Sequence, residues 1–214
     1  MQEAFYSYKR PVSVFLIWLF VLSALIGISL GYVSWFIPKT PLNLIIGAVL
    51  LFLNFPINNI KSLAVWCFAF CVGMVVEIVG VKTGILFGEY YYGDNLGVKF
   101  MEVPYLIGVY WAVLSFITAA IGRKTFTNPL PSALMGAALM VFLDVFIEQL
   151  AGEFDFWHFK DGIVPLQNYV TWFVVAFLLQ YLLLKSSRVR DFQYSLHLFL
   201  SQLAFFGGCL LLLG

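Results

Sequence analysis

The sequence predicts an all-α integral membrane protein: one domain, residues 1–214, in which about seven transmembrane helices carry a Gly/Tyr-rich capping loop at their outer end. Composition is the first observation behind this class, because 62% of the residues are hydrophobic and only 11% are charged, whereas soluble domains carry about 25% charged residues. The second is length, because the apolar residues form stretches close to the roughly 20 residues that a spanning helix needs. A net charge of +1 without a basic block gives no indication of nucleic-acid binding.

Seven apolar stretches are the candidate spans, and the prolines of the chain fall at or near their boundaries, where proline disturbs a helix least. The first stretch is long for a signal peptide, so we expect it to be retained as a helix. The second is short and is expected to be tilted, extended or partly re-entrant. We find no internal repeat and no linker, and the spans are 12–31, 42–55, 62–80, 104–121, 132–151, 168–185 and 196–213.

Basic residues predict the orientation of this bundle in the cell (cytoplasmic) membrane. Cytoplasmic loops carry an excess of Lys and Arg, and eight such residues fall on the N-terminal side against four on the other. We therefore expect a cytoplasmic N-terminus, with loops 80–97 and 152–162 together on the outer face. The eight are Lys9, Arg10, Lys61, Arg123, Lys124, Lys185, Arg188 and Arg190, and the four are Lys39, Lys82, Lys99 and Lys160.

Three acidic residues lie within predicted spans: Glu77 in the third span, and Asp144 and Glu148 in the fifth. A charged residue at the centre of a span costs about 2.5–3.5 kcal/mol on the insertion scale, and no span interior supplies a Lys or Arg partner. Glu77 and Glu148 lie roughly 4–5 Å inside their outward-facing span ends, and the i, i+4 spacing puts Asp144 on the same face as Glu148. The three therefore define a candidate site, the alternative being hydrogen-bonded or interfacial structural groups.

A cluster of buried carboxyl groups suits acid catalysis on a hydrocarbon. Burial and neighbouring carboxylates favour the neutral form of an acid, and a neutral carboxylic acid is a usable proton donor. A partner that stays ionised can position a water molecule, and aromatic faces can stabilise a carbocation. This combination fits the protonation of an alkene followed by hydration of the resulting cation.

The loop that follows Glu77 contains glycines at positions 80, 84, 88, 93 and 97 and three consecutive tyrosines. So many glycines disfavour an exposed helix, so we expect a compact capping loop that folds back over Glu77 and points Tyr90 and Tyr92 at the site. Other aromatic residues are consistent with simple interface anchors, and Trp157 is either an anchor or part of a lid. The anchor candidates are Trp35, Tyr91, Tyr105 and Tyr110.

An ordered set of motifs over roughly residues 62–172, about half of the chain, resembles the membrane carotenoid-biosynthesis family of 1,2-hydratases. This family includes bisanhydrobacterioruberin hydratase and the γ-carotene 1',2'-hydratases. The second half of the set is "LDVFIEQLA" at 143–151, then "FWHF", then "GIVPLQNYVTW" at 162–172, and the chain departs from the family pattern at Leu86, Gln149 and Phe159 without losing an acid. The first half consists of Glu77, Gly80, Thr83, Gly84, Phe87, Gly88, Tyr90, Tyr92, "VP" at 103–104 and Trp111.

The resemblance implies addition of water across the terminal C1=C2 bond of an acyclic carotenoid end, without a redox cofactor. The partners would be a carotenoid within the bilayer and water as co-substrate. Asp144, the deepest acid, is our candidate proton donor, with Glu77 and Glu148 holding water or relaying the proton, although these roles are open to exchange. The implied substrate-binding residues are Tyr90, Tyr92, Phe87, Trp111, Trp157, Asn168 and Trp172.

Other functions remain open from the sequence. A polyene cyclase also begins with alkene protonation, and "DVFIE" fits the acidic motif of an intramembrane prenyltransferase, whereas a transporter would more often show repeated halves. A metal site is not expected, because His158 and His197 fall on opposite sides of the membrane. Cys67 and Cys71, one helical turn apart, are expected to be small core residues.

Overall fold

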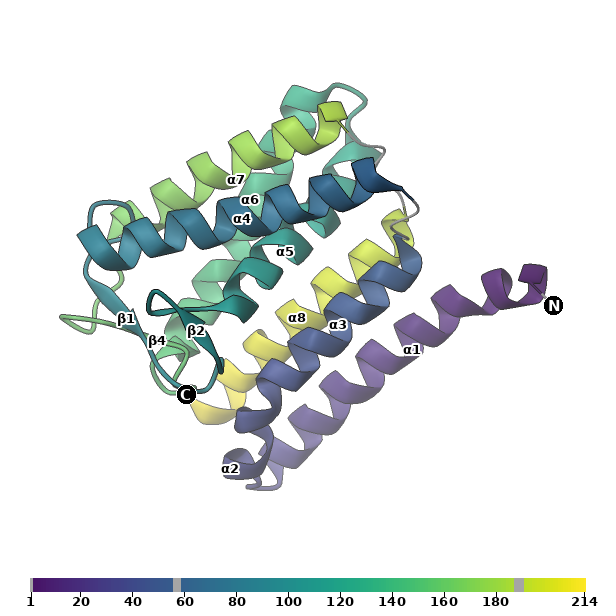
Figure 1. Ribbon diagram of the computed structural model, residues 1–214. Helices are drawn as coiled ribbons and strands as arrows, with labels where there is room; N and C mark the ends of the chain where they lie inside the picture. The colour runs from purple at the N-terminus through teal and green to yellow at the C-terminus, as the bar shows by residue number, and fades with distance from the viewer. Residues whose placement is uncertain (1, 56–58, 187–190) are drawn as a thin grey trace.

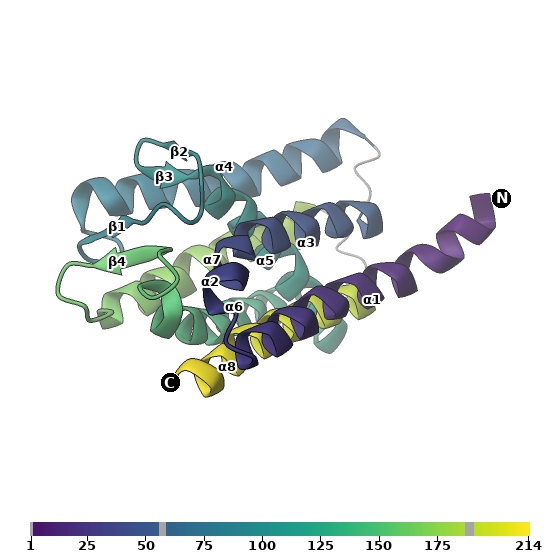
Figure 2. The ribbon, with the colours of Figure 1, turned by 90° about the horizontal axis from the view of Figure 1, so that it is seen from below.

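The computed structural model of this chain describes residues 2–55, 59–186 and 191–214 as a bundle of long helices. The helices run side by side, and the N- and C-termini lie at opposite ends of the bundle (Figures 1 and 2). Within the described residues seven helical stretches are long and apolar enough to cross a membrane. The prediction of a seven-span integral membrane protein is therefore confirmed. The stretches are Tyr8–Ser29, Val33–Asn54, Ile60–Thr83, Tyr105–Thr125, Pro129–Ala151, Leu166–Lys185 and Phe192–Leu213.

The first two spans differ from the predicted boundaries at their N-terminal ends. Helix α1, Gln2–Ser29, begins well before residue 12 and contains Pro11, so this proline does not mark its start. The second span is extended rather than re-entrant, because α2 (Val33–Phe36), the 3-10 helix η1 (Ile37–Lys39) and α3 (Thr40–Asn54) follow one another without a break. Prolines 38 and 41 each fall in the first turn of an element, where their missing N–H has no helical partner to lose.

Helix α5, Tyr105–Thr125, forms the centre of the bundle, and nearly all of its residues are buried. It contacts α3 and four further long helices. A helix that is apolar all round and touches neighbours on every side is a core helix, so α5 is the scaffold on which residues from different spans meet. The four further helices are α4 (Ile60–Thr83), α6 (Pro129–Ala151), α7 (Leu166–Ser186) and α8 (Phe192–Leu213).

Two short antiparallel strand pairs cover one end of the bundle, and the sequence did not predict them. Strand β1, Tyr90–Tyr92, pairs with β4, Trp157–Phe159, and we call this pair the ribbon. Strand β2, Lys99–Phe100, pairs with β3, Val103–Pro104. The ribbon joins the two loops that were expected to share a face, so their placement at the same end of the bundle is confirmed (Figure 2).

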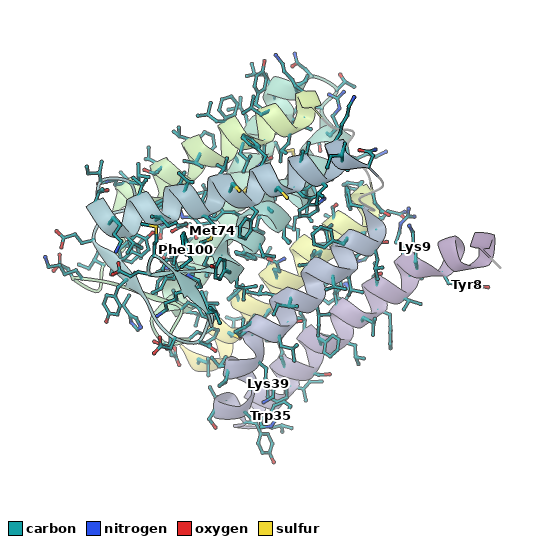
Figure 3. All side chains as sticks on the ribbon, viewed as in Figure 1. Tyr8, Lys9, Trp35, Lys39, Met74 and Phe100 are labelled. Atoms are coloured by element: carbon teal, nitrogen blue, oxygen red, sulfur yellow. The ribbon has the colours of Figure 1, made fainter. Side chains whose placement is uncertain are left out.

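The outer surface of the helices is apolar, as the side chains projecting around the bundle in Figure 3 illustrate. Cys67 and Cys71 are exposed on this surface, so their prediction as core residues is wrong, because the turn that they share faces away from α5. At the ribbon end, Lys39 lies over the ring of Trp35 at 3.4 Å from its centroid (Figure 3). The predicted basic residues Arg188 and Arg190 lie outside the described residues, and the orientation in the membrane stays a prediction.

Candidate functional site

Glu77 lies near the C-terminal end of α4 and accepts hydrogen bonds from three side chains. Its Oε2 accepts from the hydroxyls of Tyr90, at 2.5 Å, and Tyr92, at 2.7 Å, and its Oε1 accepts from Nε1 of Trp111 on α5, at 2.8 Å. Both oxygens of this buried carboxyl are thus held by neutral donors. Such donors fix the position of a carboxylate that is withdrawn from bulk water.

The sequence folds the capping loop over Glu77 by means of small residues. A Cβ on Gly80, one turn after Glu77, would lie 2.4 Å from Cδ2 of Phe87 and 2.9 Å from the Tyr90 hydroxyl. Gly88 has a φ of +96°, and a Cβ there would lie 2.7 Å from Cγ of Pro165. Only glycine fits these two close approaches, so the expected loop that folds back over the end of α4 is confirmed.

The alternation of strand β1 decides which tyrosines face the site. Tyr90 and Tyr92 are buried and Tyr91 is exposed, as the two-residue period of a strand requires. Burial, followed by the charge of the nearby Glu77, raises the pKa of the Tyr90 and Tyr92 hydroxyls above the ordinary value of 10.0. Both phenols therefore stay protonated and available as hydrogen-bond donors at neutral pH.

Asp144 and Glu148 lie one turn apart on α6 and share a partner on α7. The amide nitrogen Nδ2 of Asn168 donates to Oε1 of Glu148 at 2.8 Å and, at 3.3 Å, to Oδ2 of Asp144. The other oxygen of Glu148, Oε2, accepts from Nε1 of Trp157 on β4 at 2.8 Å. Asn168 reaches both acids because it lies in the first turn of α7, beside the end of α6.

The three carboxyl groups differ in how well the protein satisfies them. Glu77 accepts three hydrogen bonds and Glu148 accepts two, whereas the structure gives Asp144, within the part of the chain that it describes, only the 3.3 Å contact from Asn168. All three are nearly inaccessible, with 3%, 8% and 2% of their surfaces exposed. Asp144 is therefore the buried acid with the most unused hydrogen-bonding capacity.

All ten residues that the sequence predicts for the site line one pocket, which we call the acid pocket. The rings of Trp111 and Trp172 stack in its wall, with centroids 4.0 Å apart and planes 15° apart. Its cavity is about 20 Å³, counted as positions open to the centre of a water molecule, which is enough for at least one water. The catalytic and binding roles of the ten residues stay predictions. The ten are Glu77, Phe87, Tyr90, Tyr92, Trp111, Asp144, Glu148, Trp157, Asn168 and Trp172.

Tyr110 belongs to the same pocket, although the sequence suggested an interface anchor. It is buried, lines the acid pocket and donates a hydrogen bond from its hydroxyl to Oε1 of Gln202 on α8, at 2.7 Å. The anchor interpretation is therefore wrong for this residue, whereas Trp35, Tyr91 and Tyr105 are exposed, as anchors would be. The signal that could have found Tyr110 is the glutamine in the last span, a polar residue in an apolar helix.

A metal-binding arrangement is not evident in the described ranges, where no three or more His, Cys, Asp or Glu side chains are grouped to hold an ion. His158 lies 3.0 Å from Oδ1 of Asp155 and stacks on Tyr91 at the outer side of the ribbon. The ring of His158 thus belongs to the ribbon that covers the acid pocket.

Fold and site together define an integral membrane protein whose buried polar groups converge on one aromatic-walled pocket near an end of the bundle. Residues 39–214 match the model of the family described as "Carotenoid biosynthesis protein", and the chain belongs to this family. Comparisons with curated proteins and with solved structures each found no match. The chain therefore has a role in carotenoid biosynthesis, and the family implies an enzyme with a carotenoid substrate. The resemblance to a carotenoid-biosynthesis family is therefore confirmed, and the hydratase type stays a prediction.

Proposed function

We propose that the protein is a carotenoid 1,2-hydratase, which adds water across the terminal C1=C2 bond of an acyclic carotenoid end group. The observation that carries this proposal is the position of Asp144, an acid with one long hydrogen bond, in a water-sized cavity walled by aromatic rings. Membership of the carotenoid biosynthesis family supports the substrate class. The reaction needs a proton donor, a water and a shielded cation, and the pocket offers a group for each.

In the proposed reaction Asp144, in its neutral form, transfers its proton to C2 of the alkene. The π electrons form the new C–H bond and leave a tertiary cation at C1. The oxygen of water then bonds to C1, and the water proton passes to the Glu148 carboxylate, which Asn168 and Trp157 hold in place. Proton return from Glu148 to Asp144 restores both groups, so the sum is alkene plus water to tertiary alcohol.

The remaining groups of the pocket stabilise the cation without trapping it. Aromatic faces attract cations by about 0.5–2 kcal/mol each, and Trp111 and Trp172 form a stacked wall beside the acids. Glu77 adds a negative charge that cannot easily attack carbon, because Tyr90, Tyr92 and Trp111 occupy both of its oxygens. Glu77 thus stabilises the cation electrostatically, whereas Asp144 and Glu148 transfer the protons.

The closed pocket has room for water but not for a branched alkene end, so substrate entry requires side chains to move. The ribbon is the part best suited to move, because it contacts the acids through side chains of Tyr90, Tyr92 and Trp157 rather than through a helix backbone. The carotenoid chain would stay in the lipid while its end displaces these rings.

The test uses a host engineered to accumulate lycopene and γ-carotene. The wild-type chain should produce pigments heavier by one water, detected by chromatography with mass detection. Asp144→Asn should lower their yield at least about 100-fold, the usual contribution of a general acid. Asp155→Asn is the matched control, because Asp155 lies outside the acid pocket and its side chain is half exposed.

Each outcome of this experiment has a definite meaning. Pigments with altered retention but unchanged mass would replace hydration with cyclisation, which begins with the same protonation. A wild-type chain that is well expressed in the membrane but changes neither pigment would overturn the hydratase proposal for these end groups. Full activity of Asp144→Asn would remove this residue from the role of proton donor.

A further inference from the structure

A second cavity lies on the opposite side of α5, between this helix and α1, α3 and α8. It is about 30 Å³, counted as positions open to the centre of a water molecule, which again suffices for at least one water. Its lining is unusually polar for the interior of a membrane bundle, because five of its side chains carry hydrogen-bonding groups. They are Thr40, Asn43, Tyr110, Ser201 and Gln202.

Gln202 provides the strongest indication that this cavity holds a ligand. Only 8% of its surface is exposed, and its Oε1 accepts the hydrogen bond from Tyr110. The hydrogen bond that the described residues give this amide leaves its Nε2 without a partner, so this nitrogen is a donor open to a ligand of the cavity. A water molecule in the adjoining cavity would satisfy this donor.

The cavity also supplies the other hydrogen bonds that a buried water needs. The hydroxyls of Thr40 and Ser201 donate to the backbone oxygens of Ile37, at 2.8 Å, and Leu198, at 2.9 Å. Their oxygens therefore keep lone pairs free to accept from water. Together with Nε2 of Gln202 as donor, these two hydroxyl oxygens make three polar partners for a water molecule. Buried waters typically have two to four such partners.

Tyr110 connects the two cavities, since it lines both the acid pocket and the second cavity. On its far side the second cavity shares Thr40, Asn43 and Phe205 with an open groove between α1 and the α2–α3 segment. Trp35 and Lys39 border that groove, and such residues mark a membrane–water interface. Cavities that share lining residues therefore lie one after another between this groove and the acids.

We propose that the second cavity is a water-binding site and that its water reaches the acid pocket past the Tyr110 hydroxyl. The proposal deepens the hydratase function, on which it rests only for the use made of this water. Water would then arrive from the α1–α3 side, while the carotenoid end arrives from the lipid. Separate routes allow the apolar substrate to fill its entrance without blocking the supply of its co-substrate.

The site can be tested without measuring catalysis. Radiolytic footprinting of the full-length protein in bilayers, in ¹⁸O-labelled water, modifies aromatic side chains that lie beside bound water. We expect labelling of Tyr110 and Trp111, although both are buried. Trp66, which is buried against Phe116 at a ring distance of 4.0 Å and lines neither cavity, is the internal control and should stay unlabelled.

Two variants should close the route. Gln202→Leu removes the free donor, and labelling of Tyr110 and Trp111 should fall about fivefold, which corresponds to one lost hydrogen bond. Gly47→Ala places a methyl group in the lining, where its nearest neighbour is Cδ1 of Leu198 at an ordinary 3.5 Å. Gly207→Ala is the matched control, because its Cβ would lie 3.8 Å from Phe146 and outside the cavity.

The outcomes separate this inference from the proposed function. Labelling of Tyr110 as low as that of Trp66 would show a dry cavity and overturn the inference. If Trp111 stays labelled in both variants, water reaches the acids by another route, which overturns it equally. If the wild-type chain makes hydrated pigment, both variants should lower its yield relative to Gly207→Ala. If it makes none, the hydratase proposal fails, while the labelling still decides the water site.

Discussion

Two buried side-chain amides on α7, those of Asn168 and Gln180, both face α6 but differ in the hydrogen bonds that they make to it. Asn168, at one end of the interface, donates to both Glu148 and Asp144. Gln180, twelve residues further on, contacts only the sulfur of Met140 through its nitrogen, at 3.2 Å, and its Oε1 is a buried atom without a hydrogen-bond partner in the described chain. Both are almost fully buried, with 2% and 0% of their surfaces exposed.

The difference shows that burial of a polar group does not by itself mark a site. At the ribbon end every carboxyl of the pocket has an assigned donor, and these donors come from four elements of the fold, β1, α5, β4 and α7. At the other end Gln180 meets only a weak sulfur acceptor. A satisfied polar network restrains its members, whereas a half-satisfied group mainly costs stability. The organised end is therefore where loss of one partner should have the largest effects.

Among the substitutions that follow from this comparison, the largest effect is expected from Asn168→Leu. This change leaves Glu148 with one donor and Asp144 with none from the described chain, so both acids lose their orientation. Hydrated pigment should fall about 100-fold, as for a misplaced catalytic group, and the free energy of unfolding should drop by about 1–3 kcal/mol. Pigment analysis and thermal unfolding in detergent measure the two effects. Wild-type yields would mean that Asn168 is not a positioning residue.

Gly80→Ala should damage the organised end through packing alone. The added methyl group would lie 2.4 Å from Phe87 and close to the Tyr90 hydroxyl, and forcing such a contact costs about 1–3 kcal/mol. A lower unfolding temperature is expected, together with reduced protection of the ribbon amides from hydrogen exchange. Gly207→Ala, with ordinary 3.8 Å contacts, should keep the wild-type stability. Equal behaviour of the two variants would contradict the close approach of the loop to α4.

Trp111→Phe should have an intermediate effect, because it removes one donor of Glu77 and keeps a ring against Trp172. The lost bond at 2.8 Å should cost about 1–3 kcal/mol and lower the hydrated product roughly tenfold. Trp66→Phe is the matched control, since Trp66 also stacks on an aromatic ring at 4.0 Å but lies away from the acids. If both substitutions lower the yield equally, the effect belongs to packing and not to Glu77.

A small, pH-dependent effect is expected from Asp155 in the loop before β4. Its hydrogen bond with His158, and then those from the backbone of Asp94 and Asn95, hold its pKa below the ordinary 3.8. A lowered folded-state pKa stabilises the fold above pH 3.8, and this contribution is lost as the pH falls through the lower value. Thermal unfolding between pH 7 and pH 3 should show a steeper acid loss for wild type than for Asp155→Asn. Parallel curves would mean that these hydrogen bonds do not lower the pKa of Asp155 in the folded state.

The smallest effect is expected from Gln180→Leu, the counterpart of the Asn168 substitution. Replacing a poorly satisfied amide with an apolar side chain of similar size removes a buried unpaired oxygen, so the unfolding temperature should stay the same or rise slightly. The pigment yield should not change. A loss as large as that of Asn168→Leu would abolish the distinction between the two ends of the α6–α7 interface.

The bundle and the acids could be predicted from sequence because both leave a local signal. A run of apolar residues specifies a span wherever it occurs, and a carboxyl inside such a run is costly enough to stand out, as Asp144 does. The orientation of Tyr90 and Tyr92 toward Glu77 could also be predicted, because the glycine-rich loop after α4 is expected to fold back over this residue. These features depend on residues close together in the chain.

The missed features depend on partners that are distant in the chain. The ribbon pairs strands that are more than sixty residues apart, and neither three-residue strand indicates its partner. Tyr110 and Gln202 were overlooked because neutral polar residues cost less in a span than charges do. Cys67 and Cys71 were assigned to the core because an apolar helix does not reveal which of its faces meets lipid.

The three consecutive tyrosines of β1 affect how this protein can tolerate insertions and deletions. A one-residue change in the length of the loop before Tyr90 would slip the strand and exchange its faces, so that Tyr91 would point toward Glu77. One phenol would still reach the carboxylate, although two now do. Because three consecutive residues are tyrosines, such a slip would remove one of the two phenol donors of Glu77 and not both. A lineage could in this way vary the length of the cover while retaining part of the pocket.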